Sequence, residues 1–295
     1  MNFKHIGILS IGEMGFHWAR LLRRHDVDVV SRTRDRSAVT QKRAENAGVR
    51  VVDSAGQLVA ECDLIVSLVV PSAAVAVAQT VAAAVAATGR KDLFFLDANA
   101  ISPMTAAAVH DALHPLGVTC VDGCIIGSAS RLAQNAVVYA SGEQADAVRQ
   151  LSAFGFSVKI LGPQFGQASS FKILYAGLTK GLQSLLAELL TGARHVGLLD
   201  ALMERYDQSF PGLVEKVGGS IAALPVHAAR RSEEMAELAQ TFAHFGLKSE
   251  MAPAAERVLK QIAALKAGRI DETGRRQSDL AGTLALFVQK GLFRA

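Results

Sequence analysis

Residues 6–15 read IGILSIGEMG, and this stretch decides which fold we expect. An apolar run of strand length leads into a turn containing Gly12 and Gly15, and residues 16–23 after the turn favour a helix. A strand, a glycine turn and a helix in this order are the setting of a dinucleotide-binding motif, in which free N–H groups at the helix start bind phosphate oxygens. Ser10 stands where that motif has its first glycine. From this segment alone, the alternative to a dinucleotide-binding motif is an ordinary tight turn between a strand and a helix.

The pattern that begins here continues to about residue 160, because short apolar runs alternate with longer segments of helical composition. Such alternation is typical of βα units and a mostly parallel sheet. The expected strands are 6–10, 27–31, 50–52, 64–68, 93–97, 119–122, 137–140 and 157–161, and the expected helices include 35–47, 73–87, 103–113 and 144–154. Residues 1–164 are therefore predicted to form an α/β Rossmann domain.

The hydrophobic pattern changes after Gly162, Pro163 and Gly166. Strand-like runs stop there, and apolar residues recur at helical spacing as far as Phe293. We therefore expect residues 165–295 to form an all-α second domain. Its first helix is expected over residues 168–196, which is longer than an average helix and suits a central spine or a subunit contact. Later breaks are expected near Pro211, Gly218, Gly219, Pro225, Gly246 and Gly268.

The composition is that of a compact globular protein. The chain has 295 residues, enough for two domains, and 50% of them are hydrophobic and 20% charged. The net charge is only +4, with basic and acidic residues mixed along the chain, so we expect no nucleic-acid partner. Cys62, Cys120 and Cys124 do not make an even disulfide set and are expected to be reduced, which predicts a cytoplasmic protein.

One uncharged stretch, residues 64–87, is long enough to cross a bilayer. Pro71 and Ser72 divide it into a β-branched run of strand length and an alanine-rich run that favours a helix. We therefore expect a strand followed by a helix, and no membrane partner. The apolar run 6–11 is short and ends in the glycine turn, so no secretion signal is expected there.

The residues at the end of the second expected strand bear on the choice of cofactor. Enzymes that prefer NAD carry an acidic residue there, about 20 positions beyond the glycine turn, which binds the ribose 2′-hydroxyl. Here the chain reads Ser31, Arg32 and Thr33, whose hydroxyl and guanidinium groups suit a 2′-phosphate. This predicts NADP(H), with NADPH preferred over NADH. Arg36 is interpreted as a solvated residue at the start of the next helix.

Several ordered segments together resemble the β-hydroxyacid dehydrogenase family, which includes 6-phosphogluconate dehydrogenase and 3-hydroxyisobutyrate dehydrogenase. Residues 6–15 resemble its opening segment, 31–33 its Asn-Arg-Thr, 69–71 its loop beside the cofactor, and 97–103 its Asp-x-Ser-Thr-x-x-Pro substrate segment. The resemblance and the glycine turn together imply cofactor contacts from Ser10, Ile11, Gly12, Glu13, Met14, Gly15, Ser31, Arg32, Thr33, Val69, Val70, Pro71 and Asn99.

A candidate catalytic residue lies just after the expected domain boundary. Residues 166–172 read GQASSFK and are similar to the family's Gly-x-Gly-x-x-x-Lys segment, which aligns its catalytic lysine with Lys172. A desolvated lysine can give or take the proton of a carbinol while hydride moves on the other face of the carbon. The resemblance therefore implies that Lys172 is the general acid/base. A surface lysine on a long helix is the alternative.

Two departures from the family pattern leave the substrate open. Tyr175 and Ala176 stand where the family has a site asparagine, and residues 125–128, IIGS, replace its Val-Ser-Gly-Gly loop. Ser128 and Ser130 are candidates to take over from the missing serine, and Thr179 and Lys180 lie farther along the helix of Lys172. Arg231 lies near the place of a Lys-Asp pair of the family, with a salt-bridged helix surface as the alternative. The expected substrate contacts are Asn99, Ala100, Ile126, Gly127, Ser128, Thr179 and Arg231.

These observations predict an NADP(H)-dependent dehydrogenase or reductase that acts on a small polar hydroxy or oxo compound. Imine reduction and a non-catalytic NADPH sensor remain as alternatives, and by analogy with the family we expect a homodimer. His195, His227 and His244 lack the spacing of a metal site, so no metal is expected.

Overall fold

The computed structural model describes residues 3–267 and 279–294. The chain divides into two compact units, Met1–Lys172 and Ile173–Ala295. The Rossmann architecture of the first part and the helical character of the second are both confirmed.

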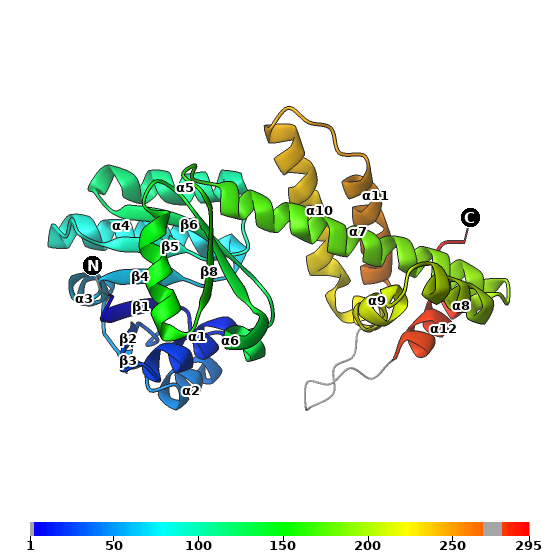
Figure 1. Cartoon of the computed structure of the whole chain (residues 1–295), viewed down its shortest axis with the longest axis horizontal. Coiled ribbons are helices and arrows are strands. Elements are labelled where there is room, and N and C mark those ends of the chain that lie inside the picture. Colours follow the sequence, from blue (N-terminus) through cyan, green and yellow to red (C-terminus); the bar gives the residue numbers. More distant parts are fainter. Residues whose placement is uncertain (1–2, 268–278, 295) are drawn as a thin grey trace. The chain divides into compact units, whose positions relative to one another are not determined.

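The first unit contains one eight-stranded sheet with the order β3-β2-β1-β4-β5-β6-β7-β8 (Figure 1). The strands are β1 (His5–Leu9), β2 (Asp28–Ser31), β3 (Arg50–Val51), β4 (Leu64–Ser67), β5 (Phe94–Asp97), β6 (Thr119–Ile126), β7 (Val137–Ser141) and β8 (Ser157–Gly162). Neighbouring strands run parallel except for β6 and β7. The order reverses at β1, since β2 and β4 lie on either side of it, and such a switch point is where open α/β sheets bind ligands.

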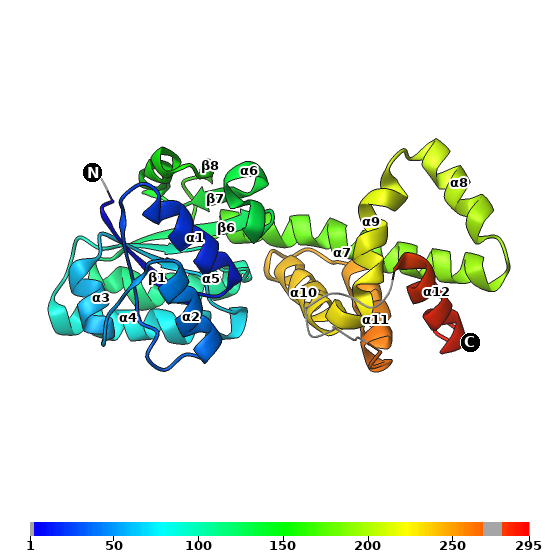
Figure 2. The ribbon, with the colours of Figure 1, turned by 90° about the horizontal axis from the view of Figure 1, so that it is seen from below.

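Helices cover both faces of this sheet (Figure 2). They are α1 (Glu13–Arg23), α2 (Ala38–Asn46), α3 (Ala55–Glu61), α4 (Ala74–Thr88), α5 (Pro103–Leu113) and α6 (Leu132–Asn135), with 3-10 turns at η1 (Pro71–Ala73), η2 (His114–Leu116) and η3 (Ala129–Arg131). Alternate residues of the strands enter two separate cores: Leu64 and Val66 join the core under α1, whereas Ile65 packs with α3, α4 and α5. Both faces of the central strands are buried, which explains their nearly continuous apolar sequences.

Two details differ from the expectation. Residues 145–154 form the 3-10 helix η4 (Ala145–Phe154) instead of an α-helix. Strand β6 continues four residues past the predicted end at residue 122, because its second half pairs with the antiparallel β7 from Asp122↔Ser141 to Ile126↔Val137.

The uncharged stretch forms a strand and a helix, as predicted. By length and composition, Pro71–Thr88 is the one helical segment among the described residues that could span a membrane. In the structure Ala78, Val81 and Val85 of this segment are buried in the core shared by α3, α4 and α5. One side of the segment thus packs on this core, and 22% of the segment is buried.

The second unit is helical. It contains most of α7 (Gln167–His195), followed by α8 (Leu199–Ser209), α9 (Leu213–Ala222), α10 (Leu224–His244), α11 (Met251–Ala264) and α12 (Leu280–Gln289). The break predicted at Gly218 and Gly219 is wrong, since both lie inside α9. A Cβ on Gly218 would lie 3.2 Å from Leu280 Cδ2, so this glycine permits close packing of α9 on α12. The break predicted at Gly268 falls outside the described residues.

Candidate active site

The turn between β1 and α1 is shaped by very close backbone packing. A Cβ on Gly15 would lie 2.2 Å from the carbonyl oxygen of Ser10, so only glycine fits there. Ser10 itself adopts φ 79°, a left-handed conformation that glycine adopts without cost and that costs other residues of order 1–2 kcal/mol. This explains why the dinucleotide motif ordinarily has glycine at that position.

Gly12 faces open space on the other side of the turn. The only neighbour of a Cβ there would be Ser10 Oγ, at 3.8 Å among the described atoms. Gly12 is the N-cap of α1 and supplies no side-chain cap, so the first N–H groups of the helix, beginning at Glu13 and Met14, remain available to a ligand. A glycine turn that leaves free N–H groups at a helix start fits a pyrophosphate.

Of the three residues predicted to bind the ribose 2′-phosphate, two point into the protein. Ser31 is fully buried, and its hydroxyl donates a hydrogen bond of 2.7 Å to the carbonyl oxygen of Ile8. Thr33 is 3% exposed. The hydroxyl of Ser31 thus joins β2 to β1, and its expected contact with the 2′-phosphate stays a prediction. Arg32 remains as the exposed side chain of the three.

Arg32 has an acidic partner nearby in the chain. Its guanidinium forms an ion pair with Asp35, and its Nε donates to the carbonyl oxygen of Asp53 at 3.4 Å. A cavity of about 100 Å³ lies beside it, lined by Leu9, Ser10, Arg32, Arg36, Ala55, Leu58, Val77, Thr80 and Val81. Arg36, interpreted from the sequence as merely solvated, therefore lines the same cavity as Arg32. Both arginines lie in the loop between β2 and α2, so no helical spacing in the sequence indicated that they share a cavity.

Asn99 ties together the ends of β4 and β5. Its Oδ1 accepts a hydrogen bond of 2.7 Å from Val69 N, and its Nδ2 donates to Ser67 Oγ at 2.9 Å. The residue is only 3% exposed, so both ends of its amide are engaged inside the protein. The structure therefore makes Asn99 a positioning residue for the loop Val69, Val70 and Pro71, while the neighbouring Ala100 is exposed.

Two carboxyl groups lie side by side in the interior, and the sequence analysis proposed neither as a site residue. Asp97 at the end of β5 is in register with Asp122 in β6. Burial raises the pKa of the Asp97 carboxyl to about 7, and the negative charge of Asp122 contributes to this rise. Asp97 Oδ1 accepts from Asn99 N at 3.0 Å, whereas Oδ2 has no hydrogen-bond partner among the described residues.

Asp122 anchors the first turn of α7. It accepts hydrogen bonds from Ser169 N at 3.0 Å, Ser169 Oγ at 2.5 Å and Ser141 Oγ at 3.0 Å, and Ser141 Oγ in turn accepts from Ala168 N at 2.9 Å. Burial raises the pKa of this carboxyl, and these hydrogen bonds oppose the rise. A carboxylate at a helix N-terminus satisfies N–H groups that have no partner within the helix. This contact places α7 on β6 and β7 and explains why the first compact unit extends into the helix, to Lys172.

Lys172 lies one turn further along α7. Its Nζ donates a hydrogen bond of 2.7 Å to the carbonyl oxygen of Ile125, so the ammonium reaches the carboxyl end of β6. The expected substrate loop, residues 126–128, follows directly. Gly127 adopts φ 138°, and a Cβ there would lie 2.4 Å from Ala136 Cα. The loop therefore has a closed base that requires glycine, and Ser128 at its tip contacts Ser130 through their hydroxyl oxygens, 3.0 Å apart.

The remaining predicted residues belong to the helical unit. Thr179 Oγ1 donates to Ala176 O at 3.0 Å, and Arg231 donates to the carbonyl oxygen of Ser220 at 3.0 Å, which ties α10 to α9. Lys180 is paired with Glu234 at 2.8 Å. Their contact with substrate stays a prediction.

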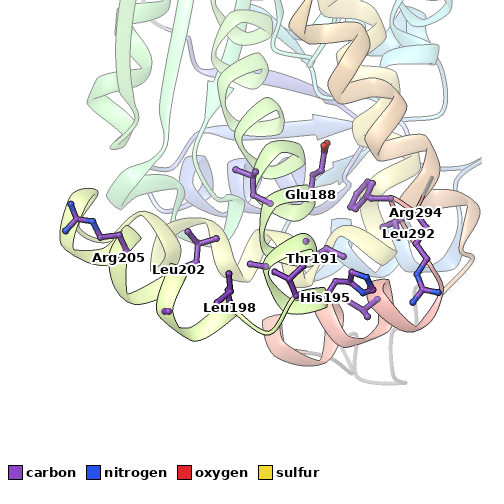
Figure 3. Close-up of a pocket in the computed structure, with 15 residues that line it drawn as sticks. Glu188, Thr191, His195, Leu198, Leu202, Arg205, Leu292 and Arg294 are labelled. Atoms are coloured by element: carbon purple, nitrogen blue, oxygen red, sulfur yellow. The ribbon is translucent and has the colours of Figure 1, made fainter.

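A large cavity of the helical unit has a different character (Figure 3). It measures about 700 Å³ and lies between the end of α7, α8 and the end of α12. Leucines 198, 202 and 292 make much of its wall, and none of the predicted site residues lines it. His195 borders it, but no group of three or more metal-ligating side chains occurs among the residues that the structure describes.

The comparisons with known proteins agree with this geometry. Residues 5–156 match the NAD binding domain of 6-phosphogluconate dehydrogenase, and residues 193–262 match a domain of unknown function, DUF1932. An uncharacterized 28.5 kDa protein from Methanothermus fervidus is 27% identical over 87% of this chain and 98% of its own. A conserved hypothetical protein from Sinorhizobium meliloti has a similar structure, with TM-score 0.75, 26% identity and coverage of 97% and 96% of the two chains.

The structure of 3-hydroxyisobutyrate dehydrogenase from Mycobacterium tuberculosis has the same fold, with TM-score 0.76 at 19% identity over 97% of this chain and 99% of its own. The match to the dinucleotide-binding domain covers just over half of the chain. It spans the glycine turn and the strands from β1 to β7. The chain therefore belongs to the β-hydroxyacid dehydrogenase family, with an NAD(P)-binding domain like that of 6-phosphogluconate dehydrogenase.

Proposed function

We propose that this protein transfers hydride between NADP(H) and a small polar hydroxy or oxo compound, with Lys172 as general acid/base. The observation that carries the proposal is the 2.7 Å hydrogen bond from Lys172 Nζ to Ile125 O. It places an ammonium group at the carboxyl end of a central strand, beside the loop that follows β6. Strand ends of this kind form the ligand crevice of doubly wound sheets.

The residues of the first unit suit the cofactor. The turn formed by Ser10, Ile11, Gly12, Glu13, Met14 and Gly15 would hold the pyrophosphate, and Val69, Val70 and Pro71 would border the cofactor. Arg32 and Arg36 would bind the 2′-phosphate from the cavity that they share. The bound cofactor would supply or accept the hydride. A reductive aminase from Aspergillus terreus has this fold and holds NADPH, and an imine reductase variant from Myxococcus stipitatus has it and holds NAD⁺. The fold therefore admits both cofactors. In this chain, Arg32 and Arg36 favour NADPH.

Lys172 would move the proton that accompanies hydride transfer. In the reductive direction its ammonium gives a proton to the carbonyl oxygen of the substrate, and in the oxidative direction the neutral amine takes it back. The buried Asp122 holds the start of α7 and thereby holds Lys172 in place. Ala100, Ile126, Gly127 and Ser128 are proposed substrate contacts, and Asn99 positions the neighbouring loop.

A homodimer is proposed because α7 carries large apolar side chains that are exposed. Leu178 is 72% exposed, and Leu174, Leu185 and Leu189 are 51%, 45% and 41% exposed. Contiguous apolar surface of this kind is typical of an interface. The change Leu178→Glu should shift the protein from dimer to monomer in light scattering, whereas Val39→Glu, at an exposed site on α2, should not. A monomeric unmodified protein would refute the dimer.

The three cysteines are free, and burial raises the pKa of each thiol to about 12. Free thiols without a disulfide support the proposal of a cytoplasmic protein.

The function is tested with a panel of hydroxy acids, sugar acids, their oxo forms and ketone–amine mixtures, followed by NADPH absorbance. Turnover of a hydroxy or oxo compound that is lost in Lys172→Met supports the proposal. Reaction only with ketone–amine mixtures would show imine chemistry. Tight NADPH binding without turnover of any compound would show a sensor.

A further inference from the structure

A second cavity of the first unit lies away from the cofactor turn, between α1 and the segment after the substrate loop. It measures about 240 Å³, and we call it the basic cavity; it is lined by His17, Arg20, Leu21, Arg24 and residues 129–134. Helix α6 and the 3-10 turn η3 lie against α1, and both views of the chain show α1 and α6 side by side (Figures 1 and 2). None of its lining residues borders the cavity of Arg32 and Arg36.

The positions of the basic side chains follow from the helix. His17, Arg20 and Arg24 are spaced at i, i+3 and i+7, so they share one face of α1. The guanidinium of Arg20 lies over the ring of Phe16, 5.5 Å from its centroid, which holds that side chain near the helix. Arg131 approaches from the opposite wall, where the buried Leu132 anchors its segment.

The arginines of this cavity have no ion-pair partner among the residues that the structure describes. No carboxylate lines it, and within the described residues no ion pair is formed by Arg20, Arg24 or Arg131. Elsewhere on the same unit, Arg50, Arg90 and Arg149 each have an acidic partner. The helix dipole favours a cation at the end of α1, but it does not account for Arg131, which comes from another segment. Like charges around one polar cavity repel one another until an anion binds, and guanidinium groups suit phosphate oxygens.

The basic cavity also adjoins the proposed substrate loop. Residues 129–134 continue directly from Ile126, Gly127 and Ser128, and the segment is closed at its base where Gly127 packs on Ala136. An anion held between α1 and this segment would restrain the segment on its outer side. We propose that the basic cavity binds a phosphate-bearing small molecule through Arg20, Arg24 and Arg131, and that this ligand steadies the segment beside the substrate loop. The binding part of this inference does not depend on the reaction or the substrate.

The binding is tested by calorimetric titration of the full chain with inorganic diphosphate. The variant Arg24→Gln/Arg131→Gln should bind it about tenfold more weakly, because two charge-assisted contacts at an exposed site are lost. The matched control is Lys42→Gln/Arg149→Gln, which removes the same charge from two exposed, ion-paired positions and should bind like the unmodified protein. Equal unfolding midpoints will show that all variants are folded, as expected for exposed side chains.

A third variant, Arg32→Gln, separates this site from the cofactor turn and should leave diphosphate binding unchanged. In the unmodified protein, diphosphate should also slow amide hydrogen exchange in residues 128–135, and it should not do so in Arg24→Gln/Arg131→Gln. The inference is overturned if diphosphate does not bind, if the charge-matched control weakens binding as much, or if only Arg32→Gln abolishes it. Binding without any change in exchange would overturn the proposed effect on the loop.

Discussion

Replacing Arg32 by alanine tests how the protein chooses between NADPH and NADH. In the structure the Arg32 guanidinium is paired with Asp35, and both side chains are substantially exposed. A 2′-phosphate must therefore compete with that carboxylate. Exposed ion pairs contribute about 0–1 kcal/mol, whereas hydrogen bonds to charged groups contribute about 1.5–3 kcal/mol. The difference leaves about 1–2 kcal/mol for Arg32, so the variant should lose roughly five- to thirtyfold in NADPH affinity.

The assay is a fluorescence titration of each variant with NADPH and with NADH. Arg32→Ala should weaken NADPH and leave NADH nearly unchanged, because NADH has no 2′-phosphate. Asp35→Asn should have the opposite effect and tighten NADPH binding by up to about fivefold, since it removes the competing carboxylate. Arg149→Ala, which removes an exposed arginine far along the chain, serves as control. Equal affinities of the unmodified protein for the two cofactors, or an Arg32→Ala variant that loses both equally, would refute the reasoning.

Three further changes test other parts of the structure. Lys172→Met should lower kcat about a hundred- to ten-thousandfold while NADPH affinity is kept, and a variant with near-normal turnover would contradict the acid/base role. Gly15→Ala should lower the free energy of unfolding in urea by about 1–3 kcal/mol, because the added Cβ would lie 2.2 Å from Ser10 O. Gly12→Ala, the control, should keep the stability of the unmodified protein but bind cofactor more weakly. Equal stabilities of the two variants would contradict the packing argument. Burial raises the pKa of Asp97 from 3.8 to about 7, so the native state holds this proton more tightly and stability should fall, by up to about 4 kcal/mol, as pH rises from about 4 to 7. Asp97→Asn should flatten this dependence in urea unfolding at several pH values, and parallel curves for both proteins would refute it.

Much of the fold could be predicted because it depends on local patterns. All eight strands were expected, since buried parallel strands are short continuous apolar runs between turn residues. Likewise, α7 was expected from helical spacing over a stretch without proline. The strand β6 was predicted too short, because its second half is stabilised by pairing with β7, and that pairing has no local signal.

The candidate site was predicted less completely, for a physical reason that concerns side-chain direction. The sequence indicates that Ser31 ends β2 and that Arg32 follows it, but the register of β2 against β1 decides that the serine hydroxyl points inward to Ile8. Similarly, no local pattern indicates that the amide of Asn99 joins the ends of two strands, and its expected contact with ligands stays a prediction.

By itself, the sequence determined the Rossmann class, the glycine turn, the helical second part and the lysine at the start of α7. Each of these features depends on a pattern of residues that are close together in the chain. Only the tertiary structure decided which groups meet. It brought Asp97 beside Asp122, Asp122 beneath the first turn of α7, and Lys172 to the carbonyl of Ile125. These contacts join residues from 25 to 47 positions apart, and strand register together with helix docking, rather than local propensity, determines them.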